Sequence, residues 1–201
     1  MDDAVIHIVD DDEALRESLS FLLDSAGFKS QVYACADALL QAPGQLAPGC
    51  ILTDVRMPGM NGLELVNVLR ERGVNHPIIM LTGHADVALA VEAMKAGVCD
   101  FLEKPFDDDA LLGAISSALE SAKPEASETS AAKQEALERL GTLTPREREV
   151  FTAIVAGDSN KAAALKLGIS PRTVEIYRAN VMSKMRAASL SDLVRMALLA
   201  E

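Results

Sequence analysis

Continuously apolar and amphipathic stretches alternate along residues 1–120. Several apolar runs are short and uninterrupted, which is typical of strands buried on both faces of a parallel sheet. Between them the apolar residues follow helical spacing. This order predicts an α/β fold, a flavodoxin-like doubly wound sheet of five parallel strands. We expect strands at 5–9, 29–33, 50–53, 78–81 and 100–103, and helices at 13–25, 36–42, 62–72, 86–96 and 107–121.

The rest of the chain carries only helix start and stop signals. Thr144 and Pro145 form an N-cap followed by proline at the first helical position, and Glu147 is a capping acid. Gly168 ends one helix and permits a tight turn into the next. These signals predict a small all-α domain of four helices, at 145–156, 160–167, 171–185 and from Ser191 onward.

A polar segment joins the two predicted domains. Pro124, several small residues and alternating charges leave it little apolar content, so we expect a tether, either a linker throughout or partly a helical extension of the preceding element. The predicted boundaries are 1–122 for the first domain, 123–137 for the linker and 138–201 for the second domain.

Charge is divided unevenly along the chain, whose net charge is −11. Residues 1–122 hold 20 acidic and 7 basic side chains, a net charge of −13. Residues 138–201 hold 7 acidic and 10 basic side chains, a net charge of +3. The acidic domain therefore suits cation binding, and the mildly basic domain is compatible with DNA.

No feature of the sequence points to a membrane. No apolar run reaches the roughly 18 to 20 residues that a bilayer span requires, and Asp2 and Asp3 do not fit the basic start of a secretory signal. We therefore expect a cytoplasmic protein without a membrane partner. The three cysteines and three histidines are scattered and match no metal-binding motif.

Polar side chains stand at the carboxyl ends of four expected strands. They are Asp10 and Asp11, Asp54, Thr82 and Lys104. Ligands of open α/β sheets bind at this edge, so we expect these side chains to form one site. Clustered carboxylates suit Mg²⁺, and a carboxylate can accept a phosphoryl group whose charge a lysine neutralises. Each residue alone is an ordinary cap or turn residue, so only the combination predicts phosphoryl transfer.

The helices at 160–167 and 171–185 form a helix-turn-helix pattern. Leu165 is among the residues expected to pack the first helix, with Ala162, Ala163 and Leu167. The second helix of such a motif enters the major groove. Spacing alone is equally compatible with a helical hairpin that has a solvated charged face. We expect DNA contacts from Lys161, Arg172, Thr173, Glu175, Ile176, Arg178 and Lys184.

Four motifs resemble the receiver domain of bacterial two-component systems over residues 1–121. They are VDDD at 9–12, DVRMPGMNG at 54–62, TGH at 82–84 and KPF at 104–106. The resemblance implies that Asp54 accepts a phosphoryl group from a histidine of a sensor kinase. It also implies that Asp11, Asp54 and the backbone carbonyl of Arg56 bind Mg²⁺, with Asp10 positioning a metal-bound water.

The same resemblance implies a conformational switch. Thr82 and Lys104 sense the phosphoryl group, and Phe101 matches the switch aromatic of the family, although its position also suits plain core packing. Phosphorylation of such receivers shifts a two-state equilibrium and usually leads to a homodimer. We expect the dimer contact to include Val91, Lys95 and Asp100.

Residues 143–150, 160–163 and 169–175 resemble the LuxR-type helix-turn-helix. With the receiver pattern, the whole chain is similar to the FixJ branch of the NarL/FixJ class. This resemblance implies a phosphorylation-activated transcriptional regulator, not an enzyme, that binds promoter DNA and works with RNA polymerase. Regulators of this branch often activate oxygen-responsive or nitrogen-fixation genes.

Two other functions fit parts of the pattern. A phosphatase that uses related aspartyl-phosphate chemistry needs a second acid near its nucleophile, but Arg56 stands two residues after Asp54. A phosphate sink or protein-binding adaptor fits the receiver pattern, and the helix-turn-helix argues against it. A gel-shift assay with and without a phosphodonor separates these functions.

Overall fold

The structure, a computed structural model, describes residues 4–42, 46–83, 87–122 and 128–200. The chain forms two compact units. The first comprises Met1–His84 and Ala96–Pro124, and the second comprises Ala85–Lys95 and Glu125–Glu201. Residues 85–95 belong to the first predicted domain but fall in the second unit. The predicted domain boundaries therefore remain a prediction.

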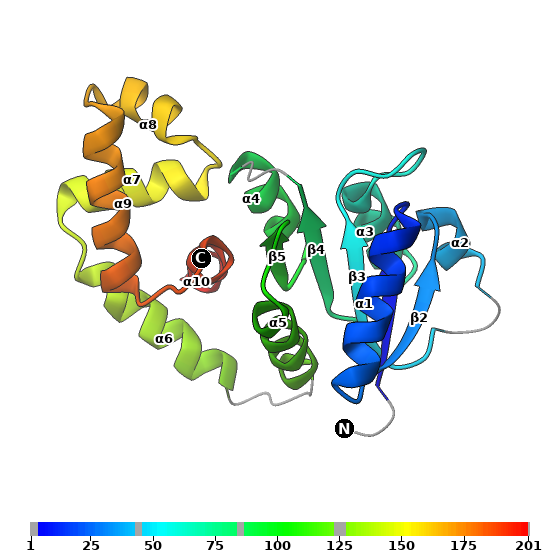
Figure 1. Cartoon of the computed structure of the whole chain (residues 1–201). Helices are drawn as coiled ribbons and strands as arrows, with labels where there is room; N and C mark the ends of the chain where they lie inside the picture. The colour runs from blue at the N-terminus through cyan, green and yellow to red at the C-terminus, as the bar shows by residue number, and fades with distance from the viewer. Residues whose placement is uncertain (1–3, 43–45, 84–86, 123–127, 201) are drawn as a thin grey trace. The chain divides into compact units, whose positions relative to one another are not determined.

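The first unit is built on a five-stranded parallel sheet with the order β2-β1-β3-β4-β5 (Figure 1). This is the flavodoxin-like order, so the predicted fold class is confirmed. Strand β3 extends one residue beyond the prediction at each end, because Gly49 pairs with Val5 and Asp54 pairs with Leu81. The strands are β1 (Val5–Val9), β2 (Lys29–Tyr33), β3 (Gly49–Asp54), β4 (Ile78–Thr82) and β5 (Asp100–Glu103).

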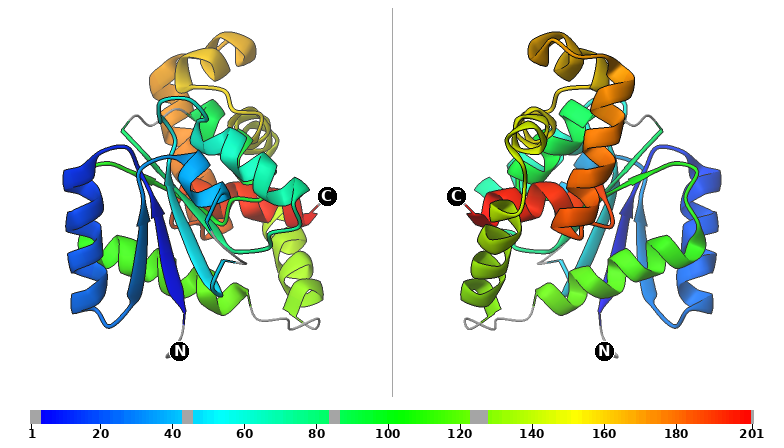
Figure 2. Two further views of the ribbon diagram at one scale, coloured as in Figure 1. Left: turned by 90° about the vertical axis from the view of Figure 1, so that its right-hand side faces the viewer. Right: turned by 90° about the vertical axis from the view of Figure 1, so that its left-hand side faces the viewer.

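Helices cover both faces of this sheet (Figure 2). On one face α1 and α5 bury Leu19 and Leu111 against Ile6 and Ile8 of β1. Asp12 caps α1, because its carboxylate accepts hydrogen bonds from two backbone N–H groups of the first turn. The helices of this unit are α1 (Glu13–Ser25), α2 (Ala36–Leu40), α3 (Gly62–Glu71) and α5 (Asp108–Ser121).

The second unit is helical. Its described elements are α4 (Val87–Lys95), α6 (Glu128–Gly141), α7 (Pro145–Val155), α8 (Asn160–Leu167), α9 (Pro171–Met185) and α10 (Leu190–Ala200). The four helices predicted for the C-terminal domain correspond to α7–α10. The predicted start of the earlier helix, Asp86, lies outside the described residues, as does His84 of the third motif.

The caps of this unit agree with the sequence signals. Thr144 and Glu147 form a reciprocal capping box at the start of α7. Gly168 ends α8 in the left-handed conformation with φ 66°, which glycine adopts without steric cost. Ser170 caps α9 by accepting a hydrogen bond from the Thr173 N–H.

One packing prediction for α8 is wrong. Leu165 is 86% exposed, whereas Ala163 and Ala164 are buried in the core with Val174 and Val181. Residues three and four apart share one face of a helix. With Ala163 and Ala164 facing inward, Leu165 is directed to the opposite side.

The predicted linker contains a helix of its own. Helix α6 begins at Glu128, inside the predicted linker, and ends at Gly141. Ala136 is buried, and α6 packs against α10 and α9. The C-terminal part of the predicted linker is therefore part of the second unit.

A small apolar cluster joins α4 to α10. It consists of Val91 and Met94 of α4 and Val194 of α10. Within the described ranges, no helix is both long and apolar enough to cross a bilayer.

Candidate functional site

The parallel sheet delivers four predicted side chains to its carboxyl edge. Asp54 and Thr82 are the last residues of β3 and β4, Asp10 directly follows β1, and Lys104 directly follows β5. Asp10, Asp54 and Thr82 are buried. These strands are neighbours in the order β1-β3-β4-β5, so the predicted convergence of their ends is realised in the fold.

Lys104 joins two of the predicted carboxylates. Its Nζ donates hydrogen bonds to Asp10 Oδ2 at 2.8 Å and to Asp54 Oδ1 at 2.5 Å. The Asp10 residue is only 2% exposed, so its charge is shielded from water. The lysine therefore neutralises two carboxylates that would otherwise repel each other.

The surroundings of Lys104 keep it protonated. Burial alone lowers the pKa of this ammonium group, but hydrogen bonds and charge interactions with Asp10 and Asp54 outweigh that effect. The net result is a pKa above the ordinary lysine value. Lys104 thus presents a full positive charge beside Asp54 at neutral pH.

Backbone groups hold the remaining carboxylate oxygens. The N–H of Arg56 donates to Asp54 Oδ2 at 2.6 Å, and the N–H of Asp12 donates to Asp10 Oδ1 at 2.9 Å. The guanidinium of Arg16 donates to the backbone carbonyl of Asp10 at 2.7 Å. Sequence reasoning did not identify Arg16. It lies on α1, and only the fold brings it to the end of β1.

Thr82 and Lys104 are also linked through the backbone. The N–H of Lys104 donates to the carbonyl of Thr82 at 2.6 Å. Phe101 pairs with Met80 across the same two strands and is partly exposed. The peptide bond between Lys104 and Pro105 is cis. The predicted sensing residues therefore lie on adjacent, hydrogen-bonded strands.

The carboxylates suit a hard cation. Asp10 and Asp54 converge on a single positive charge, and Asp11 is exposed next to Asp10. Oxygen ligands of this kind are those that Mg²⁺ prefers. In the described ranges, no three acidic, histidine or cysteine side chains are gathered closely enough to hold a metal ion without rearrangement.

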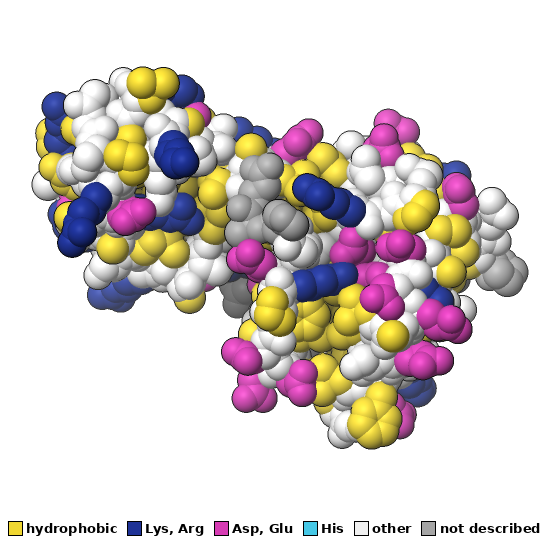
Figure 3. Space-filling view, turned by 45° about the horizontal axis from the view of Figure 1, so that its top comes forward, with side chains coloured by type: hydrophobic (Ala, Val, Ile, Leu, Met, Phe, Trp, Pro, Cys, Tyr) yellow, Lys and Arg dark blue, Asp and Glu magenta, His cyan; other side chains and the backbone are white. Residues whose placement is uncertain are grey.

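An apolar groove begins at Lys104. It has a volume of about 790 Å³ and runs between α1 and the segment that leads into α5. Leu15, Leu22 and Phe106 lie along it, and Phe21 is 77% exposed at its side. In Figure 3 this region is an apolar hollow bordered by acidic side chains. The groove therefore lies next to the ammonium group that joins Asp10 and Asp54.

The three predicted dimer-contact residues differ in exposure. Val91 is 3% exposed and packs in the cluster with Val194, whereas Lys95 is exposed. Asp100 is partly exposed, and its carboxylate accepts a hydrogen bond from the Phe101 N–H at 2.8 Å. Their part in a dimer stays a prediction.

The outer face of α9 is suited to contact DNA. Val174 and Val181 are fully buried on its inner face. Arg172 and Glu175 are exposed, and Ile176 is 57% exposed. Lys161 of α8 is exposed as well. An isoleucine that is this exposed on a charged helix face is available for apolar contact with a thymine methyl group.

The other predicted DNA-contact residues take part in local bonds. The Thr173 hydroxyl lies 2.7 Å from that of Ser170, and the Arg178 guanidinium donates to Asn160 Oδ1 at 3.4 Å. Lys184 Nζ lies 2.6 Å from Glu147 Oε2. Lys184 therefore has a structural role that spacing along a single helix did not indicate.

Comparison with known families assigns both halves of the chain. Residues 6–116 match the response regulator receiver domain. Residues 141–197 match the luxR family of bacterial regulatory proteins. The two matches include Asp54 and the whole helix-turn-helix.

Similar proteins share this combination along their whole length. FixJ of Azorhizobium caulinodans is 54% identical over 97% of this chain and 92% of its own. FixJ of Rhizobium meliloti is 48% identical over 98% of this chain and 97% of its own. The crystal structure of full-length FixJ from B. japonicum is 51% identical, covers 98% of this chain and 97% of its own, and has a TM-score of 0.59. The chain therefore belongs to the response regulators that join a receiver domain to a LuxR-type DNA-binding domain, and it is FixJ-like.

Proposed function

We propose that Asp54 is the phosphoacceptor and that its phosphorylation controls DNA binding by α8 and α9. The observation that carries the proposal is the convergence of Asp10 and Asp54 on the Lys104 ammonium group at the carboxyl edge of the sheet. A phosphoryl group in transfer carries its charge on the equatorial oxygens, and a fixed cation beside the acceptor stabilises that charge.

The transfer exchanges one bond at phosphorus. A carboxylate oxygen of Asp54 bonds to phosphorus while the P–N bond to the donor imidazole breaks, and that nitrogen keeps the electron pair. Lys104 donates to the developing negative charge, and the Arg56 N–H orients the Asp54 carboxylate. We propose Mg²⁺ as the cofactor, held by Asp11, Asp54 and the Arg56 carbonyl, with Asp10 positioning a metal-bound water. It supplies further positive charge to the phosphoryl oxygens.

The phosphodonor in this proposal is a sensor histidine kinase. Its docking surface is the apolar groove that begins at Lys104 and includes Leu15, Phe21 and Phe106. The Phe21 side chain, which is 77% exposed at the side of this groove, supports a protein contact there. The groove includes Lys104, whose ammonium group contacts Asp54, and this supports the proposal that a donor docks there.

In this proposal Thr82 and Lys104 sense the phosphoryl group, and the side chain of Phe101 changes position in response. The backbone hydrogen bond between Thr82 and Lys104 couples a displacement of either residue to the other strand. The phosphorylated chain pairs with a second copy through the surface of Val91, Lys95 and Asp100. Because Val91 is buried in the described conformation, this pairing requires a rearrangement around α4.

Recognition of promoter DNA rests on α9 in the major groove. Arg172 and Arg178 bind phosphates or guanine. Glu175 accepts a hydrogen bond from cytosine, and Ile176 contacts thymine methyl groups. Lys161, Thr173 and Lys184 add contacts at the edges of this surface. Two recognition helices of a homodimer then lie one helical turn of DNA apart, about 34–36 Å.

We propose that the exposed side chain of Leu165 contacts RNA polymerase. Leu165 is 86% exposed on α8, between Lys161 and Lys166 on the helix surface. Its side chain lies outside the core and outside α9, so it is available to a protein bound on neighbouring DNA. A Leu165→Ser variant is expected to bind DNA normally but to activate transcription poorly.

The proposal leaves the chain without an enzymatic activity of its own and places it in the cytoplasm, where its DNA is. The FixJ proteins that this chain resembles are transcriptional regulatory proteins. We propose activation of oxygen-responsive or nitrogen-fixation genes as the regulatory output of this chain. The alternative is a phosphate sink or adaptor, which accepts phosphate without any change in DNA binding.

Labelling and DNA binding can be measured on the same full-length variants. Radiolabelled acetyl phosphate with Mg²⁺ should label the wild type and Asp24→Asn, a control at an exposed acid of α1, but not Asp54→Asn. A DNA site selected from a random library with the labelled protein should bind more tightly after phosphorylation in the first two proteins only. Equal labelling of Asp54→Asn contradicts the acceptor assignment, and labelling without any change in DNA binding favours the phosphate sink.

A further inference from the structure

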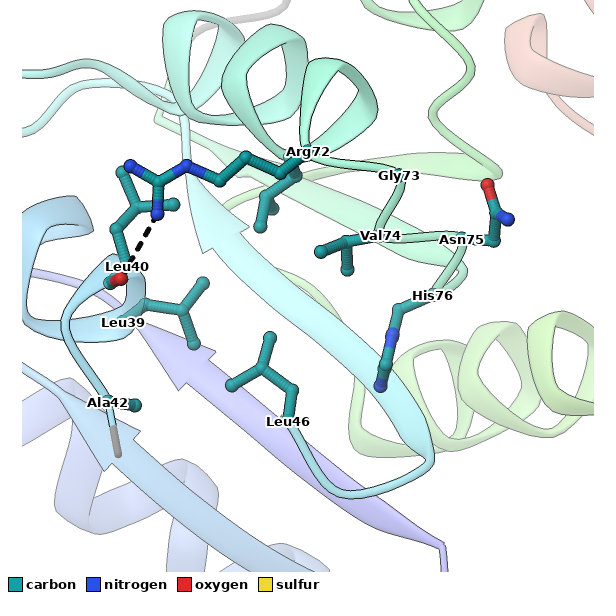
Figure 4. Close-up of a pocket in the computed structure, with 10 residues that line it drawn as sticks. Leu39, Leu40, Ala42, Leu46, Arg72, Gly73, Val74, Asn75 and His76 are labelled. Carbon is teal, nitrogen blue, oxygen red and sulfur yellow. Dashed lines mark hydrogen bonds between the residues drawn. The ribbon is translucent and has the colours of Figure 1, made fainter. Parts of the chain in front are cut away.

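A pocket lies at the amino edge of the sheet, opposite the edge that carries Asp54. Its volume is about 390 Å³, within the range of roughly 300–1,000 Å³ that small-molecule sites occupy. Its walls come from the end of α2, the segment before β3, the end of α3 and the turn before β4 (Figure 4). None of these residues belongs to the phosphoacceptor site.

The interior of the pocket is apolar. Leu39 and Leu69 are buried and form its inner wall. Leu46 and Val74 are partly exposed, and their side chains converge with Leu39 on the same space (Figure 4). A compact apolar group placed there would lose its contact with water on several sides, which favours binding.

The titratable side chains that line the pocket are Arg72 and His76, and its described lining contains no acid. This is unusual in a segment, residues 1–122, whose net charge is −13. One guanidinium nitrogen of Arg72 donates to the Leu40 carbonyl at 3.1 Å, which holds the group beside the pocket. A guanidinium has five N–H donors in a planar fork that matches a carboxylate, so this single bond leaves capacity for a ligand.

His76 adds a second fixed polar group. Its Nε2 lies 2.9 Å from the carbonyl of Ala47, which orients the imidazole at the edge of the pocket. The site thus combines an apolar interior with polar groups at defined positions, the usual composition of a small-molecule site.

We propose that this pocket binds a small carboxylate with a compact apolar body. The apolar body lies among Leu39, Leu46, Leu69 and Val74, and the carboxylate binds the Arg72 guanidinium. The volume excludes a folded partner, and the charge of the rim favours an anion over a neutral or cationic molecule of the same shape.

Three matched probes test the charge preference on the full-length protein. They are 4-methylbenzoate, 4-methylbenzyl alcohol and 4-methylbenzylammonium, followed by NMR of leucine and valine methyl groups. The carboxylate should cause saturable shifts at Leu46, Leu69 and Val74 and none at Val181 in the second unit. The alcohol should bind at least tenfold more weakly, and the ammonium should not bind.

Variants separate the two parts of the site. Arg72→Gln should reduce carboxylate affinity to that of the alcohol, whereas Val74→Trp should fill the pocket and abolish binding of both. Lys29→Gln, the same change of charge on strand β2, should leave binding unchanged. Labelling of Asp54 by acetyl phosphate serves as the folding check, because the pocket lies at the other edge of the sheet.

Two results overturn the proposal. One is equal affinity for carboxylate and alcohol, which means a neutral apolar site. The other is absence of saturable shifts with wild-type protein. Because Arg72 is exposed, its variant is expected to fold, so unchanged carboxylate binding by Arg72→Gln also contradicts the proposal even if Val74→Trp fails to fold.

Discussion

The ammonium nitrogen of Lys184 lies 2.6 Å from a carboxylate oxygen of Glu147. The same carboxylate accepts a hydrogen bond from the backbone N–H of Thr144 at 2.8 Å. One side chain thus completes the cap of α7 and ties that cap to the recognition helix α9. The arrangement fixes the direction of α9 within its own unit.

This ion pair predicts a pH-dependent stability. The hydrogen bond from Lys184, followed by that from the Thr144 N–H, lowers the pKa of Glu147 from 4.5 to about 2. A pKa that is lower in the folded state contributes stability above about pH 4.5, and this contribution is lost as pH falls toward 2. In urea denaturation, Glu147→Gln should be less stable than the wild type at pH 6, and the difference should shrink at pH 3.

A neighbouring acid supplies the control for this experiment. Glu149 pairs with Arg146 on the surface of the same helix, and exposed pairs of this kind contribute little. Glu149→Gln should therefore resemble the wild type at both pH values. An undiminished difference for Glu147→Gln at pH 3 contradicts the assigned linkage.

Removal of Lys104 should destabilise the first unit. Without its ammonium group, the carboxylates of Asp10 and Asp54 face each other uncompensated. We expect Lys104→Met to lower the free energy of unfolding by about 1–3 kcal/mol in Mg²⁺-free buffer. Lys95→Met, at an exposed position, is the control and should change little. Wild-type stability in Lys104→Met would refute the proposed charge compensation.

Substitution of Gly62 by any larger residue should lower the stability of the first unit, because Gly62, the first residue of α3, lies against the backbone of Asp54. A Cβ atom at Gly62 would lie 2.2 Å from the carbonyl oxygen of Asp54. Gly62→Ala should therefore cost about 1–3 kcal/mol and slow labelling of Asp54. Gly113, within α5, has open space around a Cβ, so Gly113→Ala should stabilise by about 0.5–1 kcal/mol. Equal stability of the two variants in urea denaturation would disprove the steric argument.

Two residues of α9 should separate stability from DNA binding. Val174 is fully buried, and Val174→Ala should lower the free energy of unfolding by about 1–3 kcal/mol. Ile176 is 57% exposed, so Ile176→Ala should leave stability nearly unchanged but weaken binding to sites that carry thymine at the contacted position. Thermal unfolding and gel-shift titration measure the two effects. Loss of stability without loss of affinity in Ile176→Ala contradicts its proposed role.

The strand ends of the receiver could be predicted because parallel strands deliver their carboxyl ends to one edge. Asp10, Asp54, Thr82 and Lys104 follow from that rule alone. The bridge from Lys104 to both carboxylates could not be predicted, because it depends on side-chain distances between the ends of β1, β3 and β5. Arg16 was missed for the same reason, since nothing in its spacing along α1 indicates which backbone carbonyl it reaches.

The helical domain was predicted from its caps, and its errors lie in packing. Spacing along α8 does not decide whether Ala164 or Leu165 faces inward, because the consecutive apolar residues 162–165 occupy more than one face of the helix. The ion pair of Lys184 could not be predicted from the spacing along α9 alone, and its contact with DNA stays a prediction. Its partner Glu147 lies 37 residues earlier, and such a pair becomes visible only when α7 and α9 are placed together.

The packing of α6 against α9 and α10 changes the effective concentration of the receiver domain relative to the DNA-binding domain. Arg139 donates to the carbonyl of Met185 at 2.9 Å, and Ala136 is buried, so this helix moves with the recognition helix. The segment between the end of α5 at Ser121 and the start of α6 at Glu128 is shorter than the predicted linker. Effective concentration rises steeply as a tether shortens, roughly with the −3/2 power of its length. A ligand that engages both domains at once therefore gains more from the tether than the length of the predicted linker implies.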